Sequence, residues 1–290
     1  MSNLRKTRFT KKKLPTDNKQ KMLHLKKHGD KQNKGRDEQQ KPHQSRQSHL
    51  GTNRNEFSRY RQAIGFHACR EALKMWPKRI KVIFLKQGWE SSQDLREMEE
   101  MARAERISVQ NQPEAFFDRL GSGHQGVSVL VDGGPVFDAK QITQLDKAVI
   151  LFLDGIVDPH NLGAIMRTSW LLGVSVIVIP HDRAVGLTPT VHKVACGGVE
   201  HVPVVFINQF NNLIDEFKQA GFWVFGLAGG EKQNLFNLRI PPKVVWIIGA
   251  EEKGLRVSTS RQCDELIAIP QINVDASYNA SVATGMALSE

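Results

Sequence analysis

Three separated segments of the chain carry amide, guanidinium, carboxylate and hydroxyl groups at spacings that could serve chemistry. The first, residues 154–168 (DGIVDPHNLGAIMRT), is expected to leave a strand through a loop and enter a helix. Asn161 and Arg167 lie six positions apart there, which is nearly two helical turns. Taken by itself, Asn161 is as readily a helix cap as a ligand, and Arg167 is either a helix-surface cation or a fork that binds phosphate.

The second segment, residues 247–255 (IIGAEEKGL), directly follows an apolar run. Gly249 and Gly254 flank a pair of glutamates, of which Glu251 is the first. Glycine at the end of a strand lets the backbone turn sharply and approach a ligand closely, and a carboxylate can hold a hydroxyl or a basic partner. A surface turn between a strand and a helix explains the same residues equally well.

The third segment, residues 269–283 (IPQINVDASYNASVA), begins where Pro270 ends an expected strand. Ser277 and Asn279 precede the last expected helix. Small hydroxyl and amide side chains at such a position suit backbone capping first and ligand contact second. Each of the three segments is therefore ambiguous in isolation.

The elements expected around these segments predict an α/β fold with a parallel sheet covered on both faces. Ligands of such sheets bind beyond the carboxyl ends of the strands, so the loops after residues 153, 248 and 269 are the candidate site. The expected strands are 148–153, 174–179, 222–227, 244–248 and 266–269, and the expected helices are 163–172, 209–219 and a last one from about 279.

A second, smaller α/β domain is predicted ahead of this one, over residues 60–132. The turn-rich sequence DGGP begins a predicted linker at residues 133–146, which leaves residues 147–290 for the larger domain. Within the smaller domain we expect helices at 64–74, 95–105 and 113–120, and strands at 80–86, 107–109 and 127–131.

The net charge of +10 is concentrated at the N-terminus. Residues 1–60 hold 17 Lys and Arg against 5 Asp and Glu, whereas the rest of the chain holds 23 against 25. Residues 1–58 have few apolar anchors, so we expect a disordered basic extension. It suits RNA, although a solubilising tail or an acidic protein or membrane surface as its target is the alternative.

Composition also narrows the cellular setting. No apolar stretch reaches the length of about 18 residues that a transmembrane helix needs. The three cysteines are far apart and form no C-x-x-C pair, which favours reduced thiols over disulfides or a zinc site. We expect a soluble, cytoplasmic protein that uses no metal.

Taken together, the three segments resemble the motifs of the SpoU (TrmH-like) family of S-adenosylmethionine-dependent RNA 2′-O-ribose methyltransferases. The family pattern N-x-G-x-x-x-R-T begins at Asn161, and G-x-E-x-x-G begins at Gly249. The pattern I-P begins at Ile269 and is followed by S-x-N-x-S-V-A from Ser277. The sequences GFH at residues 65–67 and HQG at 124–126 look like the borders of the family's L30e-like substrate-binding domain.

The resemblance implies a trefoil-knotted domain of the SPOUT class that binds S-adenosylmethionine in the knot, methylates tRNA or rRNA, and works as a homodimer. It places Arg167 at the ribose and phosphate of the target nucleotide. Because a guanidinium is almost always protonated, a substrate phosphate is expected to take or relay the proton of the 2′-hydroxyl. The donor is implied to contact Gly249, Ile269 and Tyr278, while Asn161, Glu251, Ser277 and Asn279 are implied to order Arg167, the motif loops and the nucleotide.

Four features differ from the family pattern. Asn273 replaces a usual glycine, and Tyr278 replaces a usual leucine. The common sequence S-A-G-A is ACGG at residues 195–198, and the chain ends at Glu290, earlier in the last helix than is usual. Asn tolerates positive φ better than most residues, and the bulk of Tyr278 is expected to narrow or reshape the donor pocket.

Other enzyme classes fit less well. The glycine cluster at residues 226–230 (GLAGG) lacks the G-x-G-x-x-G spacing of a dinucleotide site, and neither a P-loop nor a G-x-S-x-G sequence is present. The alternative that remains is a non-catalytic RNA-binding protein of the same fold. The five polar motif residues favour an enzyme, because RNA binding alone would not require all of them.

Overall fold

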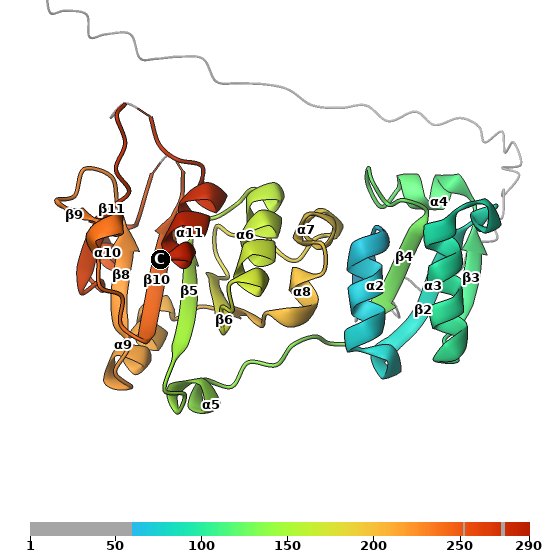
Figure 1. Cartoon of the computed structure of the whole chain (residues 1–290), viewed down its shortest axis with the longest axis horizontal. Coiled ribbons are helices and arrows are strands. Elements are labelled where there is room, and N and C mark those ends of the chain that lie inside the picture. The colour runs from blue at the N-terminus through green and yellow to red at the C-terminus, as the bar shows by residue number, and fades with distance from the viewer. Residues whose placement is uncertain (1–59, 252, 274–275) are drawn as a thin grey trace, which may run out of the picture. The chain divides into compact units, whose positions relative to one another are not determined.

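Residues 60–251, 253–273 and 276–290 are described by the structure, which is a computed structural model (Figure 1). They belong to one unit of the chain, residues 52–290, which is distinct from residues 1–51. The basic extension predicted for residues 1–58 therefore lies outside the described residues. Among the residues that are described, no helix has both the length and the apolar character needed to cross a membrane.

The N-terminal module, residues 60–131, is a four-stranded sheet with helices on both faces. Its strand order is β1-β4-β2-β3, in which β4 is antiparallel to both neighbours and β3 is parallel to β2. Apolar side chains of α2 and α3 pack on one face, and Phe117 of α4 packs on the other. The elements are β1 (Arg61–Ile64), α2 (Phe66–Met75), η1 (Pro77–Arg79), β2 (Ile80–Lys86), η2 (Trp89–Ser91), α3 (Gln93–Ala104), β3 (Val109–Gln112), α4 (Glu114–Asp118) and β4 (Val127–Val131).

The C-terminal module, residues 148–290, is built on a seven-stranded sheet of order β7-β6-β5-β10-β8-β11-β9. Every neighbouring pair in it is parallel. The elements from the connecting segment onward are α5 (Ala139–Thr143), β5 (Ala148–Asp154), α6 (Pro159–Leu171), β6 (Val176–Pro180), α7 (Pro189–Ala195), α8 (Gly198–His201), β7 (Val204–Ile207), α9 (Phe210–Gln219), β8 (Trp223–Leu227), β9 (Gln233–Asn234), η3 (Leu235–Asn237), β10 (Lys243–Gly249), α10 (Val257–Ser260), β11 (Glu265–Ala268) and α11 (Ala280–Ser289).

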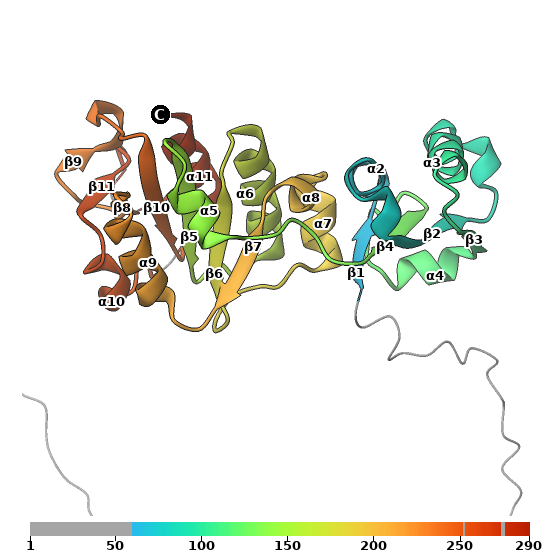
Figure 2. The ribbon, with the colours of Figure 1, turned by 90° about the horizontal axis from the view of Figure 1, so that it is seen from below.

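Helices cover both faces of this sheet, as the apolar strand sequences predict. One core cluster joins alternate residues of β5, β6 and β10 to α6, α7, α8 and α11. The other alternate residues, among them Phe152 and Val245, pack with α5 and α9 on the opposite face. Figure 2 shows these two layers on either side of the strands.

Most predicted strands are confirmed, because buried strands are apolar runs. The predicted strands 80–86 and 127–131 agree with β2 and β4 at every residue, and 148–153 lies within β5. The predicted linker 133–146 contains the short helix α5, whose Ile142 is buried. Further short elements, among them β1, β7, β9, α7, α8 and α10, were not predicted, because elements of two to seven residues carry too little periodicity.

Two predictions in the N-terminal module were wrong in position. Residues 64–74 are not one helix: Ile64 ends β1, and Gly65 with φ of 83° turns the chain into α2. Positive φ at this point favours glycine, so the strand and the helix cannot be continuous. The strand predicted at 107–109 begins only at Val109 and continues through polar residues to Gln112, where pairing with β2 outweighs the weak strand propensity.

Candidate active site

Glu251 is the hydrogen-bonding centre at which the three motif segments meet. Its Oε1 accepts hydrogen bonds from Asn161 Nδ2 at 2.9 Å, from Asn279 Nδ2, and from the backbone N–H of Ala280 at 3.2 Å. Asn279 Nδ2 also donates to Asn161 Oδ1 at 2.8 Å. Hydrogen bonds between residues 118 positions apart, as in the last pair, fix the loops of distant strands against one another. We call Asn161, Glu251 and Asn279 the motif cluster.

The two amides of the motif cluster stand at different places in their helices. Asp158 is the N-cap of α6 and accepts a hydrogen bond from the backbone N–H of His160 at 3.0 Å. The cap interpretation of Asn161 is therefore wrong. Asn161 is the buried third residue of α6, and its side-chain amide donates to Glu251. For Asn279 the cap interpretation is confirmed, because its Oδ1 accepts from the Ser281 backbone N–H at 2.9 Å.

Ser277 joins the same loops more loosely. Its hydroxyl donates to the backbone carbonyl of Glu251 across 3.5 Å, and its side chain is exposed. It does not cap α11, because Asn279 occupies that position. The structure thus brings Ser277 beside the motif cluster but leaves its hydroxyl accessible.

Gly249 ends β10 in a backbone turn too tight for any side chain. Ala250 and Gly254 exchange two backbone hydrogen bonds, of 3.2 and 2.8 Å, and Gly254 has φ of 61°. A Cβ on Gly249 would lie 2.3 Å from the carbonyl carbon of Gly254, so a side chain there cannot be accommodated. The glycines of the second motif therefore shape the turn that presents Glu251 to the motif cluster.

The residues predicted to contact the methyl donor lie at the carboxyl ends of β10 and β11. Gly249 ends β10, Ile269 follows β11, and the exposed Tyr278 donates its hydroxyl proton to the carbonyl of Pro270 at 3.0 Å. Strand β8 lies between β10 and β11, so the loop that follows it also faces this edge.

The loop after β8 was not predicted to take part. It holds Gly229 and Gly230, and a Cβ built on either glycine would meet no atom within 4 Å. Its GLAGG sequence lacks dinucleotide spacing, and only the strand order places it between the two predicted donor contacts. An open glycine loop at this edge is suited to close backbone approach by a ligand.

Arg167 stands apart from the motif cluster. It is exposed on α6, and its guanidinium contacts the thiol of Cys196, with 3.7 Å between Nη1 and Sγ. A sulfur acceptor at this distance is a weak partner for a guanidinium. Most of the donors of Arg167 are therefore available to an anionic ligand.

A buried ion pair that the motif analysis did not identify supports this edge of the sheet. Asp154, the last residue of β5, is almost fully buried and forms an ion pair with Arg256 Nε. Its second oxygen accepts from the Arg256 backbone N–H at 3.2 Å. The sequence signal was an aspartate directly after an apolar strand, and its effect is to tie the end of β5 to the loop after β10.

A cavity of about 350 Å³ opens next to Arg256 rather than at the motif cluster. It is lined by residues from the start of α9 and of α10, and its side chains are mostly amides. None of the predicted site residues lines this cavity, so we do not assign the donor to it. The lining residues are Asn208, Gln209, Phe210, Asn211, Asn212, Arg256 and Ser258.

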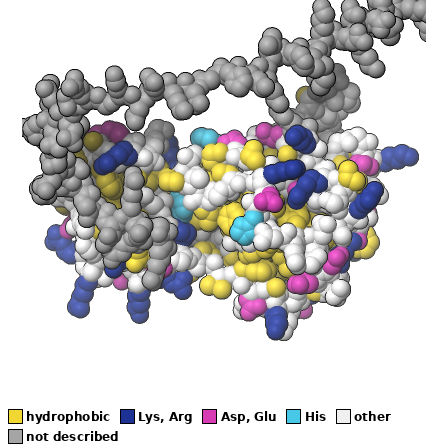
Figure 3. Space-filling view, turned by 180° about the vertical axis from the view of Figure 1, so that it is seen from behind, with side chains coloured by type: hydrophobic (Ala, Val, Ile, Leu, Met, Phe, Trp, Pro, Cys, Tyr) yellow, Lys and Arg dark blue, Asp and Glu magenta, His cyan; other side chains and the backbone are white. Residues whose placement is uncertain are grey.

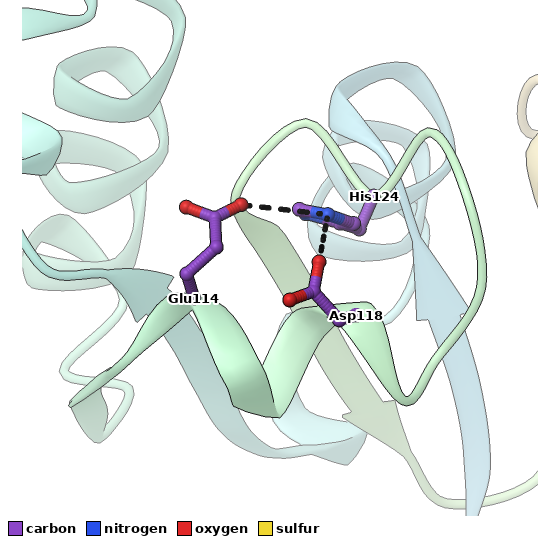
Figure 4. Close-up of side chains that lie close together, drawn as sticks. All are labelled: Glu114, Asp118 and His124. Carbon is purple, nitrogen blue, oxygen red and sulfur yellow. Dashed lines mark ion pairs between the residues drawn. The ribbon is translucent and has the colours of Figure 1, made fainter.

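A group with potential metal ligands lies in the N-terminal module (Figure 4). His124 Nε2 is 3.8 Å from Glu114 Oε1 and 3.9 Å from Asp118 Oδ1. However, His124 Nδ1 accepts the Gly126 backbone N–H at 3.1 Å, which puts the ring proton on Nε2, facing the carboxylates. The Lys86 ammonium, hydrogen-bonded to Glu114, also lowers the pKa of that carboxyl. We assign this group to loop support and not to a metal site.

Two protein-family models match the chain, and together they cover both modules. The SpoU rRNA methylase family matches residues 148–289. A model for RNA 2′-O-ribose methyltransferase substrate binding matches residues 63–133.

Curated relatives match along nearly their whole length. The 23S rRNA (guanosine-2′-O-)-methyltransferase RlmB of Pseudomonas putida is 36% identical over 240 residues, which is 81% of this chain and 96% of that protein. The protein of the same name from Neisseria meningitidis serogroup B is 37% identical over 238 residues, or 79% of this chain and 94% of the relative.

Solved structures with the same fold include two that contain the methyl donor. The SpoU methyltransferase AviRb of Streptomyces viridochromogenes in complex with AdoMet superposes with a TM-score of 0.68 at 21% identity, covering 82% of this chain and 92% of that one. An AdoMet-bound rRNA methyltransferase from Sinorhizobium meliloti gives a TM-score of 0.66 at 22% identity, with 80% and 87% coverage. At these identities the likeness shows the fold, which is that of the SPOUT class predicted from the motifs.

Proposed function

Because the chain belongs to the SpoU family of S-adenosylmethionine-dependent RNA 2′-O-ribose methyltransferases, we propose that it methylates the 2′-hydroxyl of a guanosine in 23S rRNA. The substrate is inferred from the relatives, which carry this activity in their names and are covered almost completely. The observation that carries the proposal for the site is the motif cluster, which unites all three motifs beside the helix of Arg167.

The donor site that we propose is the edge formed by the loops after β10, β8 and β11. Gly249, Ile269 and Tyr278 would hold S-adenosylmethionine there, mainly through backbone groups, and the open space at Gly229 and Gly230 would admit it. The donor supplies a methyl group on a positively charged sulfur. The half-buried Ile269 offers that molecule an apolar contact, and the exposed ring of Tyr278 borders the site.

Arg167 binds the phosphate beside the target ribose in this proposal. Its exposed guanidinium has a planar array of donors that matches phosphate oxygens, and its fixed positive charge stabilises the oxygen as the 2′-hydroxyl loses its proton. The guanidinium stays protonated, so the proton passes to a substrate phosphate oxygen. Glu251 is assigned to positioning, because its Oε1 accepts hydrogen bonds from three residues of the first and third motifs.

The motif cluster positions the reactants. Asn161 is held nearly two turns before Arg167 on the same helix, while Asn279 caps α11 and Glu251 follows β10. Their hydrogen bonds set the loops of the donor site relative to α6, and the accessible Ser277 hydroxyl is left to contact the nucleotide. Correct placement of reacting groups contributes several orders of magnitude in rate.

We also propose that the protein acts as a homodimer through α6 and α11. The two helices pack together, and both present large apolar side chains to solvent. Leu171 at the end of α6 is 68% exposed and Val282 of α11 is 47% exposed. Apolar side chains on neighbouring helices are a usual basis for association with a second copy. With ribosomal RNA as the substrate, we place the dimer in the cytoplasm.

The proposed function is tested by replacing Arg167 with lysine, which keeps the charge but loses the planar fork. We expect methyl transfer to 23S rRNA to fall about 100-fold, with S-adenosylmethionine affinity changed less than twofold. Mapping of ribose methylation after gene deletion identifies the nucleotide, and calorimetry measures donor binding. An absence of donor binding to the purified protein would instead favour the RNA-binding protein without catalysis.

The N-terminal extension is proposed to add affinity for RNA that does not depend on sequence. Figure 3 shows both Lys and Arg and Asp and Glu side chains on the face that it views. The sequence places the excess of positive charge in residues 1–60, which hold 17 Lys and Arg against 5 Asp and Glu. Deleting residues 1–54 should weaken RNA binding and flatten its salt dependence, because fewer counterions are released. Donor affinity serves as the control and should not change. Identical salt dependence with and without the extension would remove this role.

A further inference from the structure

A sharp elbow joins α7 to α8 and packs against the turn of α6 that carries Arg167. The elbow consists of Cys196 and Gly197, which both have positive φ, of 49° and 105°. An added Cβ on Gly198 would lie 2.7 Å from the Met166 carbonyl oxygen and 3.1 Å from the Arg167 nitrogen. The Cys196 thiol also contacts the Arg167 guanidinium. The elbow is therefore part of the surface on which Arg167 rests.

The same elbow is held from its other side by the N-terminal module. Arg61 of β1 donates two hydrogen bonds, of 2.9 and 2.8 Å, to the two carboxylate oxygens of Glu200 in α8. The Glu200 side chain is 1% exposed, and Arg61 also donates from Nε to the Gly133 carbonyl. A buried carboxylate keeps its charge only if it is well paired, so Glu200 depends on this arginine.

His192 does not provide Glu200 with a second positive charge. Its Nδ1 lies 3.7 Å from Glu200 Oε1, and the ring is completely buried. Burial, together with the nearby Arg61 charge, lowers the pKa of His192 to about 3, so the ring is neutral near pH 7. Arg61 is thus the charge partner that keeps Glu200, and with it α8, in place.

Two further contacts flank the elbow. Lys193 of α7 donates to the Ser122 carbonyl at 3.1 Å, in the loop before β4. On the other side, His201 Nε2 lies 3.1 Å from Glu71 of α2, and its ring stacks on Trp170 with centroids 4.1 Å apart. The N-terminal module therefore contacts the chain before and after the elbow, and the second contact reaches α6 one turn beyond Arg167.

We propose that Arg61 is a positioning residue for Arg167: by pairing with Glu200 it fixes the α7–α8 elbow, which in turn fixes the Arg167 turn of α6. The inference rests on the proposed function only for the role of Arg167 in methyl transfer. It gives the substrate-binding module a second task besides holding RNA, because the module also sets the geometry of the arginine at the reacting ribose.

The elbow carries its own reporter, the thiol of Cys196. Cys69 is completely buried, and burial raises the pKa of Cys263 to about 12, so Cys196 is the cysteine expected to react with an alkylating reagent. We would measure its alkylation by N-ethylmaleimide in the full-length protein by mass spectrometry. In Arg61→Met, Cys196 should react about tenfold faster than in the wild type, because the elbow is no longer held.

The matched control is Arg119→Met, which removes one positive charge from the same module. Arg119 is exposed, and its Nε donates only to a backbone carbonyl of its own helix, that of Ala115. Its loss should leave the Cys196 alkylation rate within twofold of the wild type. Arg61→Lys retains the charge but not the two parallel donors, and an intermediate rate is expected. Arg61→Lys also carries the test if Arg61→Met does not fold.

The kinetic arm uses saturating RNA and S-adenosylmethionine, so that weaker RNA binding cannot account for a slower reaction. Arg61→Met should lower kcat about tenfold and leave the donor Kd within twofold, because misplacement of a catalytic group affects the chemical step. An unchanged Cys196 alkylation rate, or an increase in KM for RNA with kcat unchanged, overturns the proposal. If the wild-type protein methylates no RNA, the proposed function fails, whereas the alkylation measurement still decides whether Arg61 holds the elbow.

Discussion

Two glutamates join segments that are distant in the sequence, but they do so in opposite surroundings. Glu251 lies in an exposed loop and accepts neutral amide and backbone donors from the first and third motifs. Glu200 is buried and is held by the two parallel donors of Arg61. An exposed carboxylate such as Glu251 can be solvated by water, so its charge costs little free energy. An unpaired charge on the buried Glu200 would be strongly destabilising.

Glu251 shapes the candidate site itself, whereas Glu200 supports the elements that pack beside it. Hydrogen bonds from amide and backbone donors to an exposed carboxylate contribute modestly to stability, but they set the positions of loops that touch ligands. Replacing a whole buried ion pair by apolar residues often changes stability little. Removing only one partner is strongly destabilising, because the other charge stays buried and unpaired. We therefore expect changes at Glu200 or Arg61 to affect unfolding most, and changes at Glu251 to affect catalysis more than unfolding.

The largest expected effect on stability follows from Arg61→Ala. Because it leaves a buried carboxylate without its partner, the free energy of unfolding should fall by about 3–5 kcal/mol, as measured by urea denaturation. The control is Arg103→Ala, which breaks an exposed pair with Glu99 inside α3 and should cost only about 0.5 kcal/mol. Equal losses in the two variants would contradict the distinction between buried and exposed pairs.

A pH dependence centred on His192 should come next in size. Its folded-state pKa of about 3 lies below the ordinary value of 6.5, so the unfolded chain takes up the proton first as the pH falls. Stability is therefore complete above pH 6.5 and is lost below it at about 1.4 kcal/mol per pH unit, or about 2 kcal/mol by pH 5. Urea denaturation of the wild type and of His192→Leu at pH 7 and pH 5 measures this, and the variant should lack that part of the decrease.

The smallest change in stability is expected for Glu251→Ala. Because Glu251 and Asn279 are exposed and water can take the place of the carboxylate, the free energy of unfolding should fall by only about 1 kcal/mol. The single-turnover rate of methyl transfer should nevertheless fall about tenfold or more, because the motif loops lose their common acceptor. Glu251→Gln keeps an oxygen acceptor and should lie between the two. A loss of stability in Glu251→Ala as large as that in Arg61→Ala would erase the contrast between the two glutamates.

The extent to which the sequence predicted the site depended on the kind of residue. Asn161, Glu251 and Asn279 stand in motifs whose order along the chain was recognisable, and the parallel strands bring them to one edge of the sheet. The cap interpretation of Asn161 was wrong, because Asp158 caps α6 and frees the amide for Glu251. Local propensity could not distinguish these uses, since the deciding partner is 90 residues away.

Other functional features had no local signal at all. Arg61 and Glu200 are 139 residues apart, and an arginine in a strand or a glutamate in a short helix is unremarkable by itself. The glycine loop after β8 lacked a dinucleotide pattern, and only the order β10-β8-β11 places it between the predicted donor contacts. The structure supplies these relations because strand order is not a property of any single segment.

By itself the sequence determined the family, the parallel α/β architecture and the motif residues, because apolar runs define buried strands and the motifs keep a fixed order. Tertiary structure alone decided that Glu251 accepts hydrogen bonds from both amides, that Arg167 is available to a ligand, and that Arg61 pairs with Glu200 just after the elbow. The physical reason is that a hydrogen bond or an ion pair depends on separations of about 3 Å in space, which spacing along the chain does not encode.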